Sequence, residues 1–255
     1  MLAIISPSKG QNFDTSAQTQ IHTTPDYLDR SQSLIEELLK LSEAQIGKLM
    51  AVSDKIAGLN YNRYRNFSTP FTTENAKPAM LAFTGDVYSG FQFDKFKDED
   101  FEYAQQHLRI ISGLYGLLRP MDLIQPYRLE MKTKLANPKG KDLYQFWGDL
   151  LAQKLEEAVL SQGDNVLVNL ASNEYSKAVK LKGLKKLKVV TPVFKENKEG
   201  VYKVVALYAK KARGMMSDFI IREKISDLEG LKTFCEGKYL YNESLSTENE
   251  WVFTR

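Results

Sequence analysis

Apolar segments of strand length alternate along the chain with segments of helical periodicity, and this pattern restricts the fold more than any other feature. Residues 2–6 (LAIIS) and 165–171 (NVLVNLA) are typical of buried strands. Residues 187–194 and 201–209 predict two paired strands around the polar hairpin loop KENKEG. Because no linker or repeat divides the chain and no regular βαβ rhythm appears, we predict one α+β or mixed α/β domain over residues 1–255, with a mixed central sheet and surrounding helices.

Residues 25–68 predict a helical insertion in this domain. Pro25 occupies the first position of one helix, Ser42 and Gln45 form a capping box for a second, and Ser53 caps a third. The second and third helices meet across the short turn AVSD, which predicts a helix-hairpin-helix-like element able to hold a DNA phosphate. Its candidate contact residues are Ser53, Asp54, Lys55 and Arg63. A local packing unit is the alternative, since the hairpin lacks the usual glycine.

Other segments predict further elements of both kinds. An apolar run reaches a glycine turn at 79–85 and predicts a strand, whereas the acidic start of 98–108 is typical of a helix. A buried strand begins at residue 109 and passes into a loop punctuated by glycine and proline. Residues 142–160 carry the clearest amphipathic helix in the chain, and residues 250–255 predict a short strand.

Composition excludes several kinds of protein. Hydrophobic residues make up 43% and charged residues 26%, as in ordinary globular proteins, and no apolar run approaches the roughly 20 residues of a membrane helix. The N-terminus lacks the features of a secretory signal, so we expect a cytoplasmic protein without membrane attachment. The single Cys235 excludes an internal disulfide, and with only His22 and His107 besides we expect no cofactor and no tightly bound metal.

Positive charge is concentrated in residues 176–224. This segment holds 14 Lys and Arg against 4 Asp and Glu, a local excess of +10, whereas the whole chain has a net charge of +3. Clustered cations attract phosphates and other anions. A lysine-rich solvated surface is the alternative, above all for KAVKLKGLKKLK (177–188).

Three cations of this segment lie where an apolar run stops and a helical pattern begins: Lys210, Lys211 and Arg213. If a helix begins near Ala212, its first N–H groups are unpaired, and cations there oppose the helix dipole by roughly 0.3 to 1 kcal/mol each. An anion bound among them explains the arrangement, and Gly214 lets a ligand or another backbone come close. Pairing with acids such as Asp86 or Glu174, or simple solvation, is the alternative.

A second group alternates aromatic and cationic side chains in the loop SGLYGLLRPMDLIQPYRLEM (112–131): Tyr115, Arg119, Tyr127 and Arg128. Such side chains stack on a base and hold a phosphate. In the alternative, the loop is packed, the tyrosines belong to the core and the arginines pair with Asp122 and Glu130.

A third group, SNEYSKAV (172–179), follows a predicted buried strand directly. The ends of strands in α/β sheets commonly carry ligand-binding groups. Asn173, Glu174 and Lys177 supply an amide, a carboxylate and an ammonium group. For Ser172 we favour a helix cap instead.

Seven blocks of the sequence resemble the YaaA peroxide-stress protein family, in order and over nearly the whole chain: ISPSK, SDKIAGLN, AFTGDVYSG, ISGLYGLLRPMDLIQPYRLEM, KDLYQFWGD, NLASNEYSKAV and YAKKARGMMSDFII. The resemblance implies a cytoplasmic bacterial protein that helps cells survive hydrogen peroxide by limiting free iron. It also implies binding of duplex and distorted DNA by a single-domain fold with a helix-hairpin-helix element and a positively charged cleft.

The leading hypothesis is therefore a DNA-binding stress protein, with a cleft built from Lys9, Tyr115, Arg119, Tyr127, Arg128, Asn173, Lys177, Lys210, Lys211 and Arg213. The alternative is an enzyme that acts on a nucleotide, nucleic acid or small anion in the same cleft, although common catalytic signatures are missing. Its candidate catalytic residues are Glu130, Glu174, Ser112 and Tyr175. A compact pocket favours the enzyme, and an open groove some 20 Å wide favours duplex binding. A large exposed apolar patch favours a scaffold that binds partner proteins.

Overall fold

An eight-stranded mixed sheet forms the centre of the protein, whose computed structural model describes residues 1–255. The strand order is β4-β3-β1-β6-β7-β10-β9, and β8 pairs with β7 outside this path. The strands are β1 (Leu2–Ile5), β3 (Leu108–Ser112), β4 (Gly116–Leu118), β6 (Val166–Leu170), β7 (Lys188–Lys198), β8 (Val201–Lys203), β9 (Leu240–Tyr241) and β10 (Glu250–Thr254). A second sheet pairs β2 (Lys77–Pro78) with β5 (Leu123–Ile124). The mixed sheet confirms the predicted α+β class.

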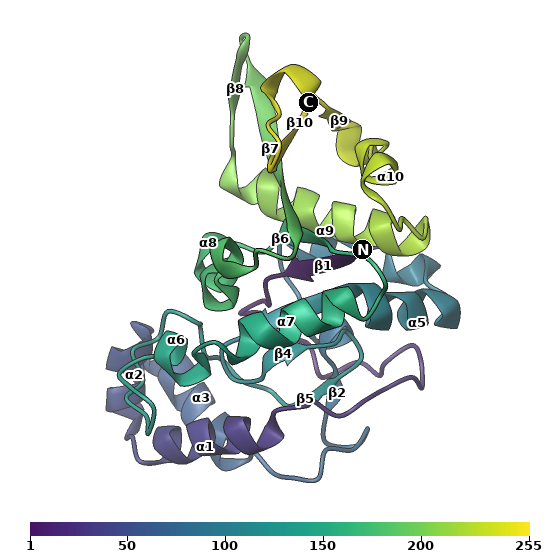
Figure 1. Cartoon of the computed structure of the whole chain (residues 1–255). Helices are drawn as coiled ribbons and strands as arrows, with labels where there is room; N and C mark the ends of the chain where they lie inside the picture. Colours follow the sequence, from purple (N-terminus) through teal and green to yellow (C-terminus); the bar gives the residue numbers. More distant parts are fainter.

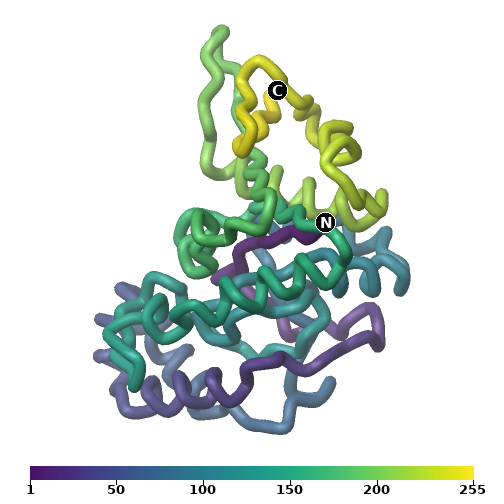
Figure 2. Tube along the Cα trace, viewed as in Figure 1, coloured from purple at the N-terminus to yellow at the C-terminus, as the bar shows by residue number.

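The first strand lies at the middle of this sheet. β1 pairs in parallel with β3 on one side and with β6 on the other, and all four of its residues are buried. Its continuous apolar sequence fits this place, because parallel strands are covered on both faces. Figure 2 traces this N-terminal strand through the middle of the molecule.

β7 is the longest strand and changes its partners along its length. It pairs with β6 from Lys188 to Val190, then with β10 from Thr191 to Lys195, and finally with β8 in a hairpin closed by Gly200. The outer part of the sheet therefore stands above the long helix α9 (Ala206–Arg222), as Figure 1 shows.

Nine further α-helices cover the sheets: α1 (Leu28–Leu39), α2 (Glu43–Met50), α3 (Asp54–Arg65), α4 (Ala79–Ala82), α5 (Asp98–His107), α6 (Leu143–Trp147), α7 (Leu150–Leu160), α8 (Asn173–Ser176) and α10 (Leu228–Lys232). Short 3-10 turns are η1 (Tyr88–Gly90), η2 (Phe93–Lys95), η3 (Lys177–Val179), η4 (Leu181–Gly183), η5 (Glu236–Lys238) and η6 (Glu243–Leu245). None of the helices is long and apolar enough to cross a lipid bilayer.

The predicted helices of residues 25–68 are present, with differences at their starts. The capping box of Ser42 and Gln45 is confirmed, whereas Ser53 occupies the N-cap position of α3 without a side-chain cap bond. Ala51 takes the left-handed conformation (φ 51°) in the turn between α2 and α3, where glycine is usual. The first helix begins at Leu28, after Pro25, because the preceding segment is bound elsewhere: the Thr23 N–H donates to the Met121 carbonyl.

Three predicted elements are wrong in kind or extent. Residues 79–82 form α4, not a strand, and the Ala79 N–H donates to the Asp122 carbonyl outside any sheet. The helix expected over 142–160 is two helices, broken at Gly148, whose φ is +56°. The strand expected over 201–209 ends at Lys203, and α9 begins at Ala206.

Gly214 determines how α9 packs on the rest of the fold. A Cβ atom at this position would lie 1.7 Å from the Val87 carbonyl oxygen and 3.2 Å from the Cα of Gly90. The backbones of α9 and η1 therefore touch directly, as expected from the close approach that glycine permits. This contact places the second and third turns of α9 beside the loop of Gly85 to Val87.

Candidate anion-binding site

A cavity of about 410 Å³ lies at the carboxyl ends of β1 and β6. Two loops that follow these strands form part of its wall, and α9 and two further loops complete it. The wall residues that matter below are Ser8, Lys9, Glu130, Glu174, Lys210 and Arg213.

The loops after β1 and β6 are held together by two serines. The Ser172 N–H donates to the Ser6 hydroxyl oxygen at 2.9 Å, and the Ser6 hydroxyl donates to the Ser172 hydroxyl at 3.3 Å. Ser172 stands at the N-cap position of α8, but its side chain makes no cap bond. The capping role expected for Ser172 is therefore wrong, and its hydroxyl faces the cavity instead.

The three cations of α9 lie within the helix rather than at its start. Because α9 begins at Ala206, the Ala209 N–H already donates to the Val205 carbonyl, and the backbone N–H groups near Lys210 are not free. The expected helix terminus near Ala212 is thus wrong. Lys210 and Arg213 are three residues apart and share one face, which lines the cavity, whereas the exposed Lys211 does not line it.

Arg213 is the cavity's most unusual cation. It is partly buried, and its guanidinium group makes no hydrogen bond and no ion pair within the protein, although an arginine carries five N–H donors. Burial lowers the pKa of Arg213 below its usual value, and no neighbouring acid offsets that effect. An anion bound in the cavity would stabilise such a group.

Lys210 forms an ion pair with Asp86, which the sequence indicated as an alternative partner for these cations. Its Nζ lies 3.3 Å from the Asp86 carboxylate, and both side chains are about half exposed, at 53% and 41%. An ion pair as exposed as this one contributes roughly 0 to 1 kcal/mol. Lys210 can therefore leave Asp86 for a bound anion with little loss.

Glu130 also lines the cavity, and two cations neutralise its negative charge. Lys9 Nζ is 2.8 Å from one of its carboxylate oxygens, and Arg128 Nε is 3.3 Å from the other. Burial alone would raise the pKa of Glu130, but the hydrogen bond and charge of Lys9 and the charge of Arg128 outweigh it and lower the pKa. The group is therefore an ionised hydrogen-bond acceptor at neutral pH.

Glu174 and Lys132 complete the polar wall. Glu174 Oε1 accepts a hydrogen bond from the Lys132 backbone N–H at 3.2 Å, and Tyr175 lies beside it. Burial raises the pKa of Tyr175 far above its ordinary value, so the phenol stays protonated. The other members of this sequence group, Asn173 and Lys177, are exposed and do not line the cavity; Lys177 Nζ lies 4.8 Å from the centre of the Tyr144 ring.

The aromatic side chains of the 112–131 loop are part of the core. Tyr115 is 0% and Tyr127 4% exposed, and their rings meet edge to face at 5.1 Å between centroids. Ser112 is also buried, and its hydroxyl lies 2.7 Å from the Tyr127 hydroxyl. Base stacking by these tyrosines and nucleophilic attack by this serine need open faces that the structure does not provide.

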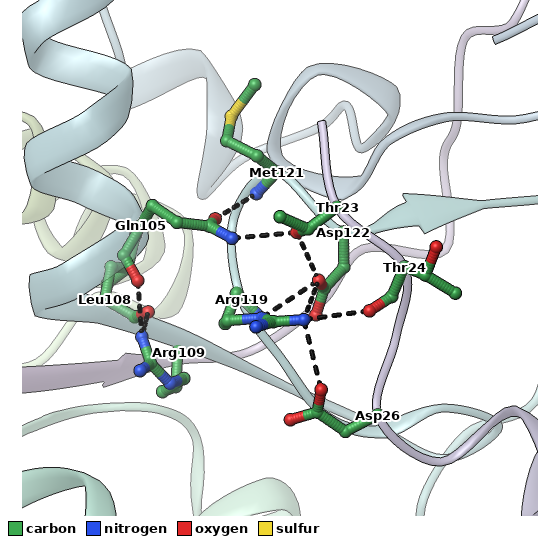
Figure 3. Close-up of polar contacts among 9 residues, drawn as sticks. All are labelled: Thr23, Thr24, Asp26, Gln105, Leu108, Arg109, Arg119, Met121 and Asp122. Carbon is green, nitrogen blue, oxygen red and sulfur yellow. Dashed lines mark hydrogen bonds and ion pairs between the residues drawn. The ribbon is translucent and has the colours of Figure 1, made fainter. Parts of the chain in front are cut away.

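The arginines of the same loop form internal ion pairs. Arg119 contacts the Asp122 carboxylate at 3.0 Å and Asp26 at 3.1 Å, and it donates to the Thr24 carbonyl at 2.8 Å, as Figure 3 shows. Arg128 pairs with Glu130. The packed-loop interpretation of residues 112–131 is therefore the one that the contacts support.

Other sequence candidates lie outside the cavity. The helix-hairpin-helix-like residues Ser53, Asp54, Lys55 and Arg63 belong to α3 and its connection to α2, at the end of the molecule opposite the β7–β8 hairpin (Figure 1). Lys55 is exposed and unpaired, whereas Arg63 donates to the Asn60 side chain at 3.4 Å. No group of three or more His, Cys, Asp or Glu side chains is placed to hold a metal ion.

Four residues of the cavity wall were not predicted as site residues from the sequence: Ser6, Ser8, Asp86 and Lys132. The two serines had a signal, since Ser6 ends the first predicted strand and Ser8 follows it closely, as SNEYSKAV follows a later one. Asp86 and Lys132 had none, because each comes from a loop whose position depends on long-range packing.

The chain matches a known protein family over most of its length. A family model described as peroxide stress protein YaaA covers residues 1–245 of the 255. The match includes every strand except the last and every residue of the cavity wall. The chain therefore belongs to the peroxide stress protein YaaA family.

Proposed function

We propose that this member of the family acts in the cytoplasm during peroxide stress by binding DNA through phosphate contacts, and that it thereby helps limit free iron and oxidative damage. The proposed contact surface comprises the cations of α9, of residues 177–188 and of the β7–β8 hairpin. The cavity wall contributes Lys9, Lys210 and Arg213 to it.

The observation that carries this proposal is positive charge without an internal partner. Of the 14 Lys and Arg in residues 176–224, five form ion pairs and nine do not. The nine are Lys177, Lys182, Lys185, Lys188, Lys195, Lys198, Lys203, Lys211 and Arg213. Cations left unpaired in this way are available to phosphates, which supply most of the affinity for nucleic acid.

Exposed aromatic side chains accompany these cations. Half of the ten exposed large apolar residues lie within eight positions: Val201, Tyr202, Val204, Leu207 and Tyr208. Tyr202 and Tyr208 are 37% and 45% exposed and are interleaved with Lys203 and Lys211. The sequence indicated a combination of aromatic rings and cations at residues 112–131, where the rings are buried. A comparable combination is exposed at residues 201–211, where bases can reach it.

The salt dependence of DNA binding tests the proposal. A triple variant, Lys210→Ala with Lys211→Ala and Arg213→Ala, should bind a short duplex more weakly. Each lost phosphate contact should reduce the slope of log K against log salt by roughly 0.9, or by up to about 2.7 for all three. A control triple variant, Lys40→Ala with Lys97→Ala and Lys154→Ala, removes equal charge from ion pairs outside the segment and should change the slope little. Equal slopes for wild type and the α9 variant would refute this assignment.

The iron effect is tested in cells. After hydrogen peroxide treatment, cells that carry the α9 triple variant should contain more chelatable iron, measured by electron paramagnetic resonance, than cells with the wild type. Equal iron levels in cells whose variant has lost DNA binding would exclude DNA binding as the route to the iron effect.

A second candidate function is an enzyme that acts on a nucleotide or another small anion. The compactness of the cavity favours it, as do the carboxylates of Glu130 and Glu174 beside four cations. Incubation of the protein with single nucleotides and with DNA, followed by chromatography, should then yield a product that Glu174→Gln does not form. Identical chromatograms with and without protein would exclude this activity for the substrates used.

A further inference from the structure

The cavity beside α9 lies where the strand order of the central sheet changes direction. β1 and β6 are parallel neighbours at the middle of the sheet. From β1 the chain continues to β3 on one side of this pair, and from β6 it continues to β7 on the other side. In open α/β sheets, small ligands bind outside the carboxyl ends of the strands at such a switch point. Ser6 and Ser172 follow the two strands and line the cavity.

The size of the cavity limits its occupant. One base-pair layer of B-DNA, roughly 20 Å across and 3.4 Å thick, occupies about 1,000 Å³. The cavity, at about 410 Å³, is less than half as large. It lies within the range usual for small-molecule sites, which is the size class of a single nucleotide.

One end of the cavity suits a phosphate group. The Arg213 guanidinium has all its donors free, and its planar fork matches two phosphate oxygens. Lys210, one turn away on the same face, is bound only by the exposed Asp86. Both cations can contact one phosphate placed beside α9.

The other wall suits a neutral group that both donates and accepts hydrogen bonds. The hydroxyls of Ser8 and Ser172 accept hydrogen bonds from the protein but donate none, so each retains a free donor. Glu174 offers a carboxylate oxygen that no protein group uses. The free oxygen of Glu174 repels a bare phosphate but accepts a hydrogen bond, so this wall suits the hydroxyl or amino groups of a sugar or base.

We propose that the cavity binds a single nucleotide unit, with its phosphate on Arg213 and Lys210 and its sugar and base against Ser8, Ser172 and Glu174. The unit is either a free nucleoside monophosphate or one nucleotide extruded from a DNA strand. The second source rests on the proposed DNA-binding function, because extrusion requires bound DNA.

Fluorescence of 2-aminopurine distinguishes the two sources. The first arm uses a DNA duplex with one 2-aminopurine at a mismatch, whose fluorescence rises severalfold when the base leaves the stack; DNA affinity is measured on the same samples. The second arm measures adenosine 5′-monophosphate binding by calorimetry. Arg213→Ala removes the phosphate contact, and Ser8→Phe fills the cavity from an exposed loop. Lys154→Ala is the control, because Lys154 pairs with Glu157 on α7 and does not line the cavity.

A fluorescence rise that Arg213→Ala and Ser8→Phe abolish and Lys154→Ala preserves would support extrusion. Monophosphate binding that the same two variants weaken at least tenfold, without a rise on DNA, would support the free nucleotide. DNA binding with no rise and no monophosphate binding would overturn this inference and leave the proposed function intact. If DNA does not bind, the proposed function fails, and monophosphate binding alone decides whether this inference stands.

Discussion

Replacing Gly214 with alanine should destabilise the fold, although alanine is the better helix former. A Cβ at this position would lie 1.7 Å from the Val87 carbonyl oxygen and 2.8 Å from its carbon, far below the roughly 3.5 to 4.0 Å of van der Waals contact. Both atoms belong to the backbone, so α9 and η1 must separate. Overpacking of this kind costs roughly 1 to 3 kcal/mol, and a backbone clash falls at the upper end. Alanine recovers about 1 kcal/mol of helix propensity, which leaves a net loss of about 2 kcal/mol.

Gly58→Ala is the matched control for Gly214→Ala. Gly58 also lies inside a helix, α3, but its Cβ would meet only the mobile end of the Glu43 side chain, at 3.3 Å. Gly58→Ala should therefore raise the unfolding free energy by up to about 1 kcal/mol. In urea titrations the two variants should shift the midpoint in opposite directions, and the melting temperature of Gly214→Ala should fall by about 4 to 8 °C. A Gly214→Ala protein at least as stable as the wild type would refute the direct backbone contact of α9 with η1.

Two further predictions concern buried charges. The Lys77 ammonium donates to the carbonyls of Asn12 and Thr15 at 3.1 and 2.8 Å and to the Thr15 hydroxyl at 3.1 Å. Lys77→Met should therefore lower the unfolding free energy, measured by urea titration, by about 1 to 3 kcal/mol. A change below about 0.5 kcal/mol would contradict this role of Lys77. The pKa of Glu130 is lower in the folded than in the unfolded protein. The ionised carboxylate therefore stabilises the fold at a pH above its unfolded pKa of about 4.3. This contribution is lost as the pH falls toward the folded pKa. The stability of the wild type should therefore fall more steeply than that of Glu130→Gln between roughly pH 5 and pH 3, and parallel curves would contradict it.

Elements with strong local signals were predictable from the sequence. The strands at Leu2–Ile5 and Val166–Leu170 are short and, apart from Asn169, apolar, and the capping box at Ser42 marks its helix without ambiguity. The errors arise where local preference and long-range contacts disagree. Residues 79–82 look like a strand, but their N–H groups bond to the loop at Pro120 and Asp122, which no local pattern reveals.

The start of α9 shows a different difficulty. Val204 and Val205 continue the strand-like composition of β8, so the sequence does not mark the change to helix at Ala206. This error displaced the expected helix terminus but kept the right cations, because Lys210 and Arg213 share a face in either register. In the 112–131 loop, the sequence shows an acid three residues after Arg119 and another two residues after Arg128. Only the packing of the loop decides whether these arginines pair with those acids or remain exposed.

The central place of β1 has a consequence for synthesis on the ribosome. Ala3 pairs with Leu108 and Leu2 with Leu167, so β1 emerges before partners that lie 105 and 165 residues downstream. At about 5 to 20 residues per second, the second partner follows roughly 8 to 30 s later. During that interval the apolar segment Leu2–Ile5 is an unpaired strand, open to chaperones and to neighbouring nascent chains. The centre of the sheet is thus completed only when β6 has left the ribosome.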